Sequence, residues 1–161
     1  MNTIHMMIGI QGSGKTTYAK VLSKGLDIPI ISSDGVRNER PDLLEKDIFP
    51  EVYRRCAEIL TNGGDFIYDA TNITPKVRKR LLDNLKELGI DIENLNLYAY
   101  YFEPDLKLSL ERIERRNKDP KERFLPLGVV SDYAKNIIEP TDEEGFVQII
   151  KISRYFHRKV N

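Results

Sequence analysis

One segment, Gly9–Thr16, constrains the fold more than any other part of the chain. Its sequence, GIQGSGKT, has the pattern G-x-x-x-x-G-K-[ST] and comes directly after the apolar run 4–10. A glycine-rich turn between a strand and a helix directs backbone N–H groups and the positive end of the helix dipole at one anion. The pattern therefore predicts a phosphate-binding loop, which is typical of proteins that bind nucleoside triphosphates.

The residues expected to hold the nucleotide are consecutive: Gly12, Ser13, Gly14, Lys15, Thr16 and Thr17. The Lys15 side chain would reach the β- and γ-phosphates and take part in catalysis, and the Thr16 hydroxyl would bind Mg²⁺. The expected cofactors are therefore ATP and Mg²⁺. The plain alternative is a glycine turn before an ordinary helix.

Composition bounds the remaining possibilities. A chain of 161 residues favours a single domain, 1–161. The 25 basic side chains balance 25 acidic ones, so no overall positive field indicates bulk binding to nucleic acid or membranes. No apolar run approaches the roughly 18 residues of a membrane span, and no signal-peptide pattern begins the chain, which favours a cytoplasmic protein. The single cysteine, Cys56, excludes a disulfide within the chain and is expected to pack in the core.

Apolar runs of strand length alternate with stretches of helical period, which predicts an α/β fold: a three-layer α/β/α sandwich with a mainly parallel sheet. The expected strands are 3–10, 29–33, 65–69, 95–102 and 147–153. Helices are expected over 15–24, ending before Gly25, around 49–60 with Phe49 and Tyr53 in the core, from Thr74 to 88, from Pro104, and after Gly128. A basic tail, with Arg154, His157, Arg158 and Lys159, follows the last strand.

The second expected strand ends in S-S-D-G-V-R, which places Asp34 and Arg37 at the carboxyl edge of the sheet, where open α/β sheets bind ligands. A carboxylate there could accept the proton of an attacking hydroxyl, and a guanidinium could bind an acceptor phosphate. Alternatively, Asp34 caps a short helix and Arg37 is a surface charge.

The third expected strand, F-I-Y-D, ends in Asp69 in a Walker B-like arrangement, so this carboxylate could hold the Mg²⁺ shell, through water, or orient a neighbouring arginine. Thr71 and Asn72 follow it and are further candidates for contact with the acceptor. The alternative for Asp69 is a turn residue after a buried strand.

Arginines gather after the fourth strand. Arg112, Arg115 and Arg116 share one helical face, and Arg123 follows in a segment that contains Pro120, Pro126 and Gly128. This pattern predicts an arginine-bearing lid over approximately 112–128, from which such side chains stabilise transferring phosphoryl groups. The alternative is a solvated face paired with Glu111 and Glu114.

Together, the GxxxxGKT loop, S-S-D-x-x-R, D-A-T-N and R-N-x-x-x-x-x-R resemble, in order and spacing, the kinase domain of polynucleotide 5′-hydroxyl kinases, a P-loop nucleoside triphosphate hydrolase fold. The segment 140–146, P-T-D-E-E-G-F, resembles a stretch of animal polynucleotide kinase-phosphatases, and its Thr141 and Glu144 have capping-box spacing. The wider group includes zeta-toxin-like AAA_33-type ATPases.

The resemblance implies that Asp34 is the general base, that Arg37 binds the acceptor phosphate with support from Asp69, and that Arg116 and Arg123 are the lid arginines. Where relatives often carry another lid arginine, this chain has Pro120, so either the adenosine is clamped differently or Arg112 or Arg115 substitutes. The implied acceptor is the 5′-hydroxyl end of DNA or RNA. A small-molecule acceptor, or a nucleotide-dependent switch without an alcohol acceptor, stays open. No D-x-D-x-[TV] phosphatase signature occurs, and the sequence does not predict an oligomeric state.

Overall fold

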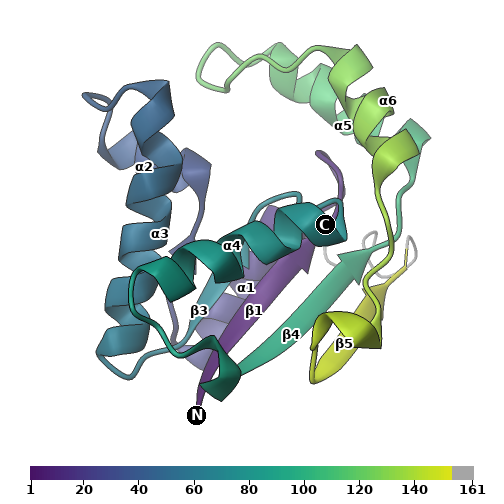
Figure 1. Cartoon of the computed structure of the whole chain (residues 1–161). Helices are drawn as coiled ribbons and strands as arrows, with labels where there is room; N and C mark the ends of the chain where they lie inside the picture. Colours follow the sequence, from purple (N-terminus) through teal and green to yellow (C-terminus); the bar gives the residue numbers. More distant parts are fainter. Residues whose placement is uncertain (154–161) are drawn as a thin grey trace.

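The computed structural model describes residues 1–153, so the basic tail noted above lies outside the described residues. Its five described strands form one parallel sheet in the order β2-β3-β1-β4-β5 (Figure 1). The strands are β1 (Asn2–Ile8), β2 (Ile30–Ile31), β3 (Phe66–Asp69), β4 (Leu95–Phe102) and β5 (Gln148–Ile152). The α-helices are α1 (Lys15–Leu26), α2 (Ser33–Glu39), α3 (Glu45–Thr61), α4 (Pro75–Glu87), α5 (Leu106–Asn117) and α6 (Leu127–Asn136), and two short 3₁₀ helices are η1 (Ile92–Asn94) and η2 (Asp142–Glu144).

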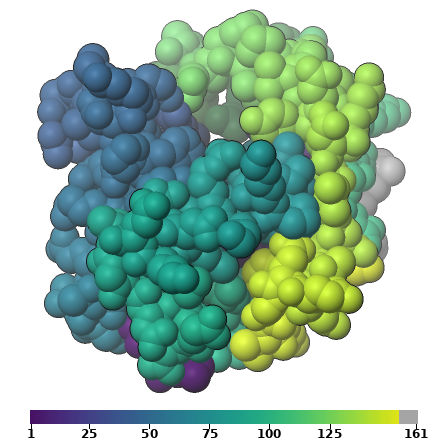
Figure 2. Space-filling model, viewed as in Figure 1, coloured from purple at the N-terminus to yellow at the C-terminus, as the bar shows by residue number. Residues whose placement is uncertain are grey.

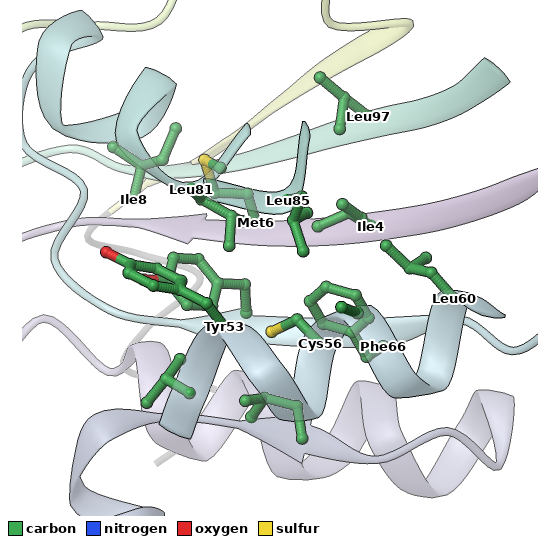
Figure 3. Close-up of a cluster of buried hydrophobic side chains, with 14 of the residues drawn as sticks. Ile4, Met6, Ile8, Tyr53, Cys56, Leu60, Phe66, Leu81, Leu85 and Leu97 are labelled. Carbon is green, nitrogen blue, oxygen red and sulfur yellow. The ribbon is translucent and has the colours of Figure 1, made fainter. Parts of the chain in front are cut away.

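Two apolar clusters, one on each face of the sheet, hold the three layers together. Alternate residues of β1 point to opposite faces, so Ile4 and Met6 join α3 and α4 on one face, whereas Met7 joins Ala19 of α1 on the other. Figure 3 shows the α3–α4 side, where Cys56 is among the buried side chains. Burial on both faces explains the nearly continuous apolar run of β1, and the predicted α/β/α sandwich is confirmed.

Three local predictions were wrong. Helix α1 continues through Gly25 to Leu26 and ends at Asp27, which adopts the left-handed conformation at φ 55° that was expected of a glycine. Phe49 was expected in the core with Tyr53, but 40% of its surface is exposed while Tyr53 is buried. Ser33 was expected to end the second strand, but it begins the short helix α2, so a short helix at Asp34, which was only the alternative interpretation, is present.

Helices α5 and α6 stand beyond the carboxyl ends of the strands and not on either face of the sheet (Figure 1). A third small cluster, made of Ile10, Ile113 and Val130, packs them against the end of the first strand. The loop between them extends towards α2 in Figure 1. The carboxyl edge of the sheet therefore lies between α2 and the α5–α6 unit, and Figure 2 shows the surface hollowed between the blue residues of α2 and α3 and the green residues of α5 and α6. Within residues 1–153, no helix is long and apolar enough to cross a membrane.

A buried ion pair ties the C-terminal segment to the centre of the fold. Only 2% of Arg78 in α4 is exposed, and its Nε donates to Glu144 Oε1 at 2.7 Å. The same guanidinium donates to the carbonyl oxygens of Asn72 and Ile138, and Glu144 also accepts from the Thr141 N–H. The predicted capping box at Thr141 and Glu144 is confirmed, and Glu144 additionally neutralises Arg78.

Replacing Glu144 with alanine should lower the free energy of unfolding by about 3 kcal/mol, because it leaves the buried Arg78 charge without its carboxylate. Urea denaturation followed by circular dichroism measures the change. Asp83→Asn, in the same helix as Arg78, is the matched control. It removes an exposed ion pair with Lys79 and should change the free energy of unfolding by less than about 0.5 kcal/mol. Equal losses in the two variants would contradict the role of the Arg78–Glu144 pair.

Candidate active site

The phosphate loop joins β1 to α1, and two of its glycines have conformations that other residues rarely adopt. Gly12 has φ 74° and Gly14 has φ 94°. A Cβ atom at Gly12 would lie 2.8 Å from the Ser109 carbonyl oxygen, because α5 packs directly on the loop. The glycine at position 12 is thus required both by its backbone angle and by its neighbour.

Arg112 also supports the loop from α5. Its Nη1 donates to the Gly12 carbonyl oxygen at 3.1 Å, and burial lowers the pKa of its guanidinium. The sequence placed Arg112 among the lid candidates, but did not indicate that it holds the phosphate loop. Only its position on the helical face shared with Arg115 and Arg116 hinted at a role.

Lys15 is buried at the start of α1, and its Nζ donates to the Ile10 carbonyl oxygen at 3.1 Å. Burial lowers the pKa of Lys15; the negative charges of Asp69 and Asp34 oppose the shift, and the positive charge of Arg116 adds to it. The charges of these three residues therefore all act on Lys15, although the residues come from β3, α2 and α5. An anion bound beside Lys15 would compensate the cost of burying its ammonium group.

Thr16 and Asp69, the predicted metal ligands, are in direct contact. Thr16 Oγ1 donates to Asp69 Oδ2 at 2.9 Å, because parallel pairing of β1 with β3 sets Asp69 beside Met7 at the base of the loop. A hydroxyl and a carboxylate are hard oxygen donors of the kind Mg²⁺ prefers, and Mg²⁺ bound with a nucleotide needs only one or two protein carboxylates.

Ser13, Gly14 and Thr17 complete the predicted nucleotide set. Ser13 Oγ is buried and makes no hydrogen bond within residues 1–153, and a Cβ atom at Gly9 would come within 2.9 Å of it. Gly14 immediately precedes α1, and Thr17 lies exposed in its first turn. The loop thus presents backbone N–H groups, one unpartnered buried hydroxyl and a helix N-terminus together, which is the chemistry of a phosphate site.

Thr71 and Asn72 brace the loop. The Gly9 N–H donates to the Thr71 carbonyl oxygen at 3.0 Å, and Asn72 Nδ2 donates to the Met7 carbonyl oxygen at 2.8 Å. Asn72 is buried and has φ 49°, a left-handed conformation that asparagine tolerates better than most residues. These contacts support β1 and the loop. The Asn72 side chain is buried, so it presents no group at the surface to an acceptor.

Asp34 and Arg37 lie on α2, whose N-terminus is capped by the Ser32 hydroxyl and not by Asp34. Asp34 is exposed, and its Oδ1 accepts from Arg37 Nη1 at 2.9 Å. The opposite edge of the Arg37 guanidinium faces Glu45 at the start of α3, with Arg37 Nε at 3.1 and 3.2 Å from the two Glu45 carboxylate oxygens. No sequence pattern had singled out Glu45, since its partner lies in a different helix.

The lid arginines Arg116 and Arg123 are both exposed. Arg116 Nη2 lies 3.4 Å from Glu122 Oε2, a partner that sequence reasoning had not considered. Arg123 belongs to the α5–α6 loop, and its charge adds to the Arg37 hydrogen bonds that lower the pKa of Glu45. Two hydrogen bonds between the Asn117 side chain and the Leu125 backbone close the loop that contains Pro120. Asn117 Nδ2 donates to the Leu125 carbonyl oxygen at 2.7 Å, and Asn117 Oδ1 accepts from the Leu125 N–H at 2.9 Å.

The fold and the site together define a P-loop kinase-like domain. The chain belongs to the AAA_33 family, described as an AAA domain, whose model matches residues 4–140. No curated protein matches the sequence significantly.

Solved structures share this fold at low sequence identity. A candidate kinase from Chloroflexus aurantiacus is 18% identical, with a TM-score of 0.74 over 99% of this chain and 89% of that one. A chain of the Pnkp1/Rnl/Hen1 RNA repair complex is 20% identical, with a TM-score of 0.69 over 84% of this chain and 43% of that one. The APS kinase CysC of Mycobacterium tuberculosis is 16% identical, with a TM-score of 0.56 over 99% and 93%. The similarity extends to kinases with unlike acceptors.

Gly12→Ala should destabilise the protein by about 2 kcal/mol and weaken nucleotide binding at least tenfold, because its methyl group meets α5 and its backbone angle is strained. Chemical denaturation and calorimetric titration with ADP measure the two effects. Gly25→Ala is the matched control: it lies inside α1 with open space around its Cβ position, and should be neutral or stabilising by up to about 1 kcal/mol. Undiminished ADP binding by Gly12→Ala would contradict the loop assignment.

Proposed function

We propose that the protein is an ATP- and Mg²⁺-dependent kinase that transfers the γ-phosphate to an alcohol, with the 5′-hydroxyl end of DNA or RNA as its acceptor. The observation that carries the proposal is the position of Asp34. This exposed carboxylate lies close enough to Lys15 for its charge to act on the ammonium group, yet it comes from α2, outside the phosphate loop. A base beside the γ-phosphate but outside the nucleotide site has the position that an attacking hydroxyl requires.

In the proposed reaction, Lys15 and the loop N–H groups would hold the β- and γ-phosphates, and Thr16 and Asp69 would hold Mg²⁺. The ion would neutralise charge on the phosphate oxygens. Asp34 accepts the proton of the acceptor hydroxyl while the hydroxyl oxygen bonds to the γ-phosphorus. The bond between that phosphorus and the ADP oxygen breaks. Arg116, whose charge also acts on Lys15, stabilises the transferring group from α5.

Three observations support a nucleic-acid acceptor. The order of motifs resembles that of polynucleotide kinases, and structures of the same fold include a fungal RNA kinase, with a TM-score of 0.62. In addition, Phe49 lies one helical turn after Glu45 on α3 and is 40% exposed. An exposed aromatic ring on the helical face that approaches Arg37 could stack on a terminal base.

A specific observation also favours a second candidate, a small-molecule acceptor. The Arg37 guanidinium is already bonded by Asp34 and Glu45, so its N–H groups are engaged without an acceptor phosphate. Neutral polyhydroxyl acceptors would not need them. Kinases of this fold include a sugar kinase from Janibacter sp., which is 16% identical with a TM-score of 0.63.

An acceptor screen separates these possibilities. The protein is incubated with γ-labelled ATP, Mg²⁺ and, in parallel, 5′-hydroxyl DNA or RNA oligonucleotides, nucleosides and sugars. We expect label at the oligonucleotide 5′ end. Transfer only to a nucleoside or sugar would reject the nucleic-acid acceptor, and slow ATP hydrolysis indifferent to every alcohol would instead support a nucleotide-dependent switch.

Asp34→Asn should lower kcat for phosphoryl transfer by a factor of about 10²–10⁴, the range for loss of a general base, while the Kd for ADP changes little. Steady-state kinetics and calorimetry give the two quantities. Asp42→Asn serves as the control, since Asp42 pairs with Arg40 on the surface of the same region. Full activity of Asp34→Asn would reject the general-base assignment.

Asp69→Asn should raise the Mg²⁺ concentration required for half-maximal activity by about tenfold, because it removes the carboxylate beside Thr16. Binding of metal-free ADP, measured in the presence of EDTA, should not weaken in this variant. An unchanged Mg²⁺ dependence would show that Asp69 does not serve the ion.

A further inference from the structure

Arg37 is surrounded by oxygen atoms on every side of its guanidinium group. Its Nη1 donates to Asp34 at 2.9 Å and to Ser33 Oγ at 3.2 Å. Its Nε and Nη2 both donate to Glu45, which occupies the opposite edge as a fork. That edge, with two parallel N–H groups, is the one an arginine uses to bind a phosphate or carboxylate in a bidentate manner.

We propose that Glu45 is an acceptor-selectivity residue, whose carboxylate competes with an acceptor's phosphate for the Nε–Nη2 edge of Arg37. The inference rests on the proposed function in one respect, that the acceptor binds beside Asp34 and Arg37. An acceptor that carries a phosphate near its hydroxyl has to displace Glu45, whereas a neutral polyhydroxyl acceptor does not. The strength of the Arg37–Glu45 pair therefore sets the preference of the site between these two substrate classes.

Glu45 is free to leave because the fold does not depend on it. It is 66% exposed, so the pair is screened by solvent and costs little to break. It lies in the first turn of α3, where the helix dipole favours a carboxylate even without Arg37. Helices α2 and α3 also have a second link, since Arg55 Nη1 bonds Glu39 Oε2 at 2.7 Å.

A second cation is available to the displaced carboxylate. Hydrogen bonds from Arg37 lower the pKa of Glu45, and the charge of Arg123 in the α5–α6 loop lowers it further. The positive charge of Arg123 therefore still favours the ionised form of Glu45 when a phosphate takes the Arg37 edge.

The test compares Glu45→Gln with Glu39→Gln. The two glutamates are equally exposed and each pairs an arginine between α2 and α3, but Glu39 is bonded to Arg55 and not to Arg37. Thymidine 3′-monophosphate and thymidine are titrated calorimetrically into protein saturated with MgADP, which occupies the phosphate loop. Melting temperatures check that both variants fold like the wild type.

Glu45→Gln should tighten thymidine 3′-monophosphate by about 2- to 5-fold, the range expected for removing an exposed ion pair, and leave thymidine unchanged. Glu39→Gln should change neither. The inference would be overturned if Glu45→Gln bound thymidine 3′-monophosphate no more tightly than the wild type does, or if its affinities for both ligands changed in parallel. It would also be overturned if no variant bound thymidine 3′-monophosphate.

Activity assays on the same proteins separate this inference from the proposed function. If the wild type transfers phosphate to no alcohol but Glu45→Gln still binds the 3′-nucleotide more tightly, the kinase proposal fails and the Glu45 competition is retained. If the wild type is an active kinase and the ratio of the two affinities does not move, the Glu45 inference alone fails.

Discussion

Parallel pairing of β1 with β3 on one side and β4 on the other is the constraint on which the site depends. The register places Met7 beside Asp69 and Ile8 beside Tyr101, so all three strands end at the same edge of the sheet. Every segment that leaves this edge starts near the phosphate loop. Asp69 consequently reaches Thr16 across 53 positions of sequence, and α5, which follows β4, packs on Gly12.

The nucleotide side of the site is held by buried hydrogen bonds that reach far along the chain. Asn72 bonds the Met7 carbonyl, and Arg78 bonds the Asn72 carbonyl and Glu144. Glu144, which lies 128 positions after the end of the phosphate loop, thus helps to fix the turn that braces the loop. Unpaired buried polar groups are costly, so these bonds favour one arrangement of the loop over others.

The proposed acceptor side is built differently. Asp34, Glu45 and Arg116 are exposed and take part in solvent-screened ion pairs, whereas Arg37 is partly buried. Such contacts exchange partners at small cost. The groups proposed to bind the acceptor are therefore less firmly held than the phosphate loop, and the fold does not by itself specify a substrate.

Much of the fold was predictable because its signals are local. The strand, loop and helix at 4–26 follow from apolar runs and glycine spacing, and Thr74-Pro75 does begin α4. Three local signals misled: Asp27 ends α1 in place of Gly25, Ser33 begins a helix where the end of a strand was expected, and Phe49 is exposed despite its helical spacing with Tyr53. The spacing of apolar residues predicts which face of a helix is buried. It does not predict how far along the helix the neighbouring elements cover that face.

The sequence by itself determined the kind of chemistry, because the GIQGSGKT loop, Asp69, and the pair Asp34 and Arg37 carry their functional groups in short, recognisable motifs. Only the tertiary structure decided how these groups are partnered. It assigned Arg112 to the phosphate loop, Arg78 to Glu144, and Glu45 to Arg37. Each of these pairs joins residues of different elements. The distance between such residues depends on how the helices pack against the sheet, and the spacing of residues along the sequence does not predict it.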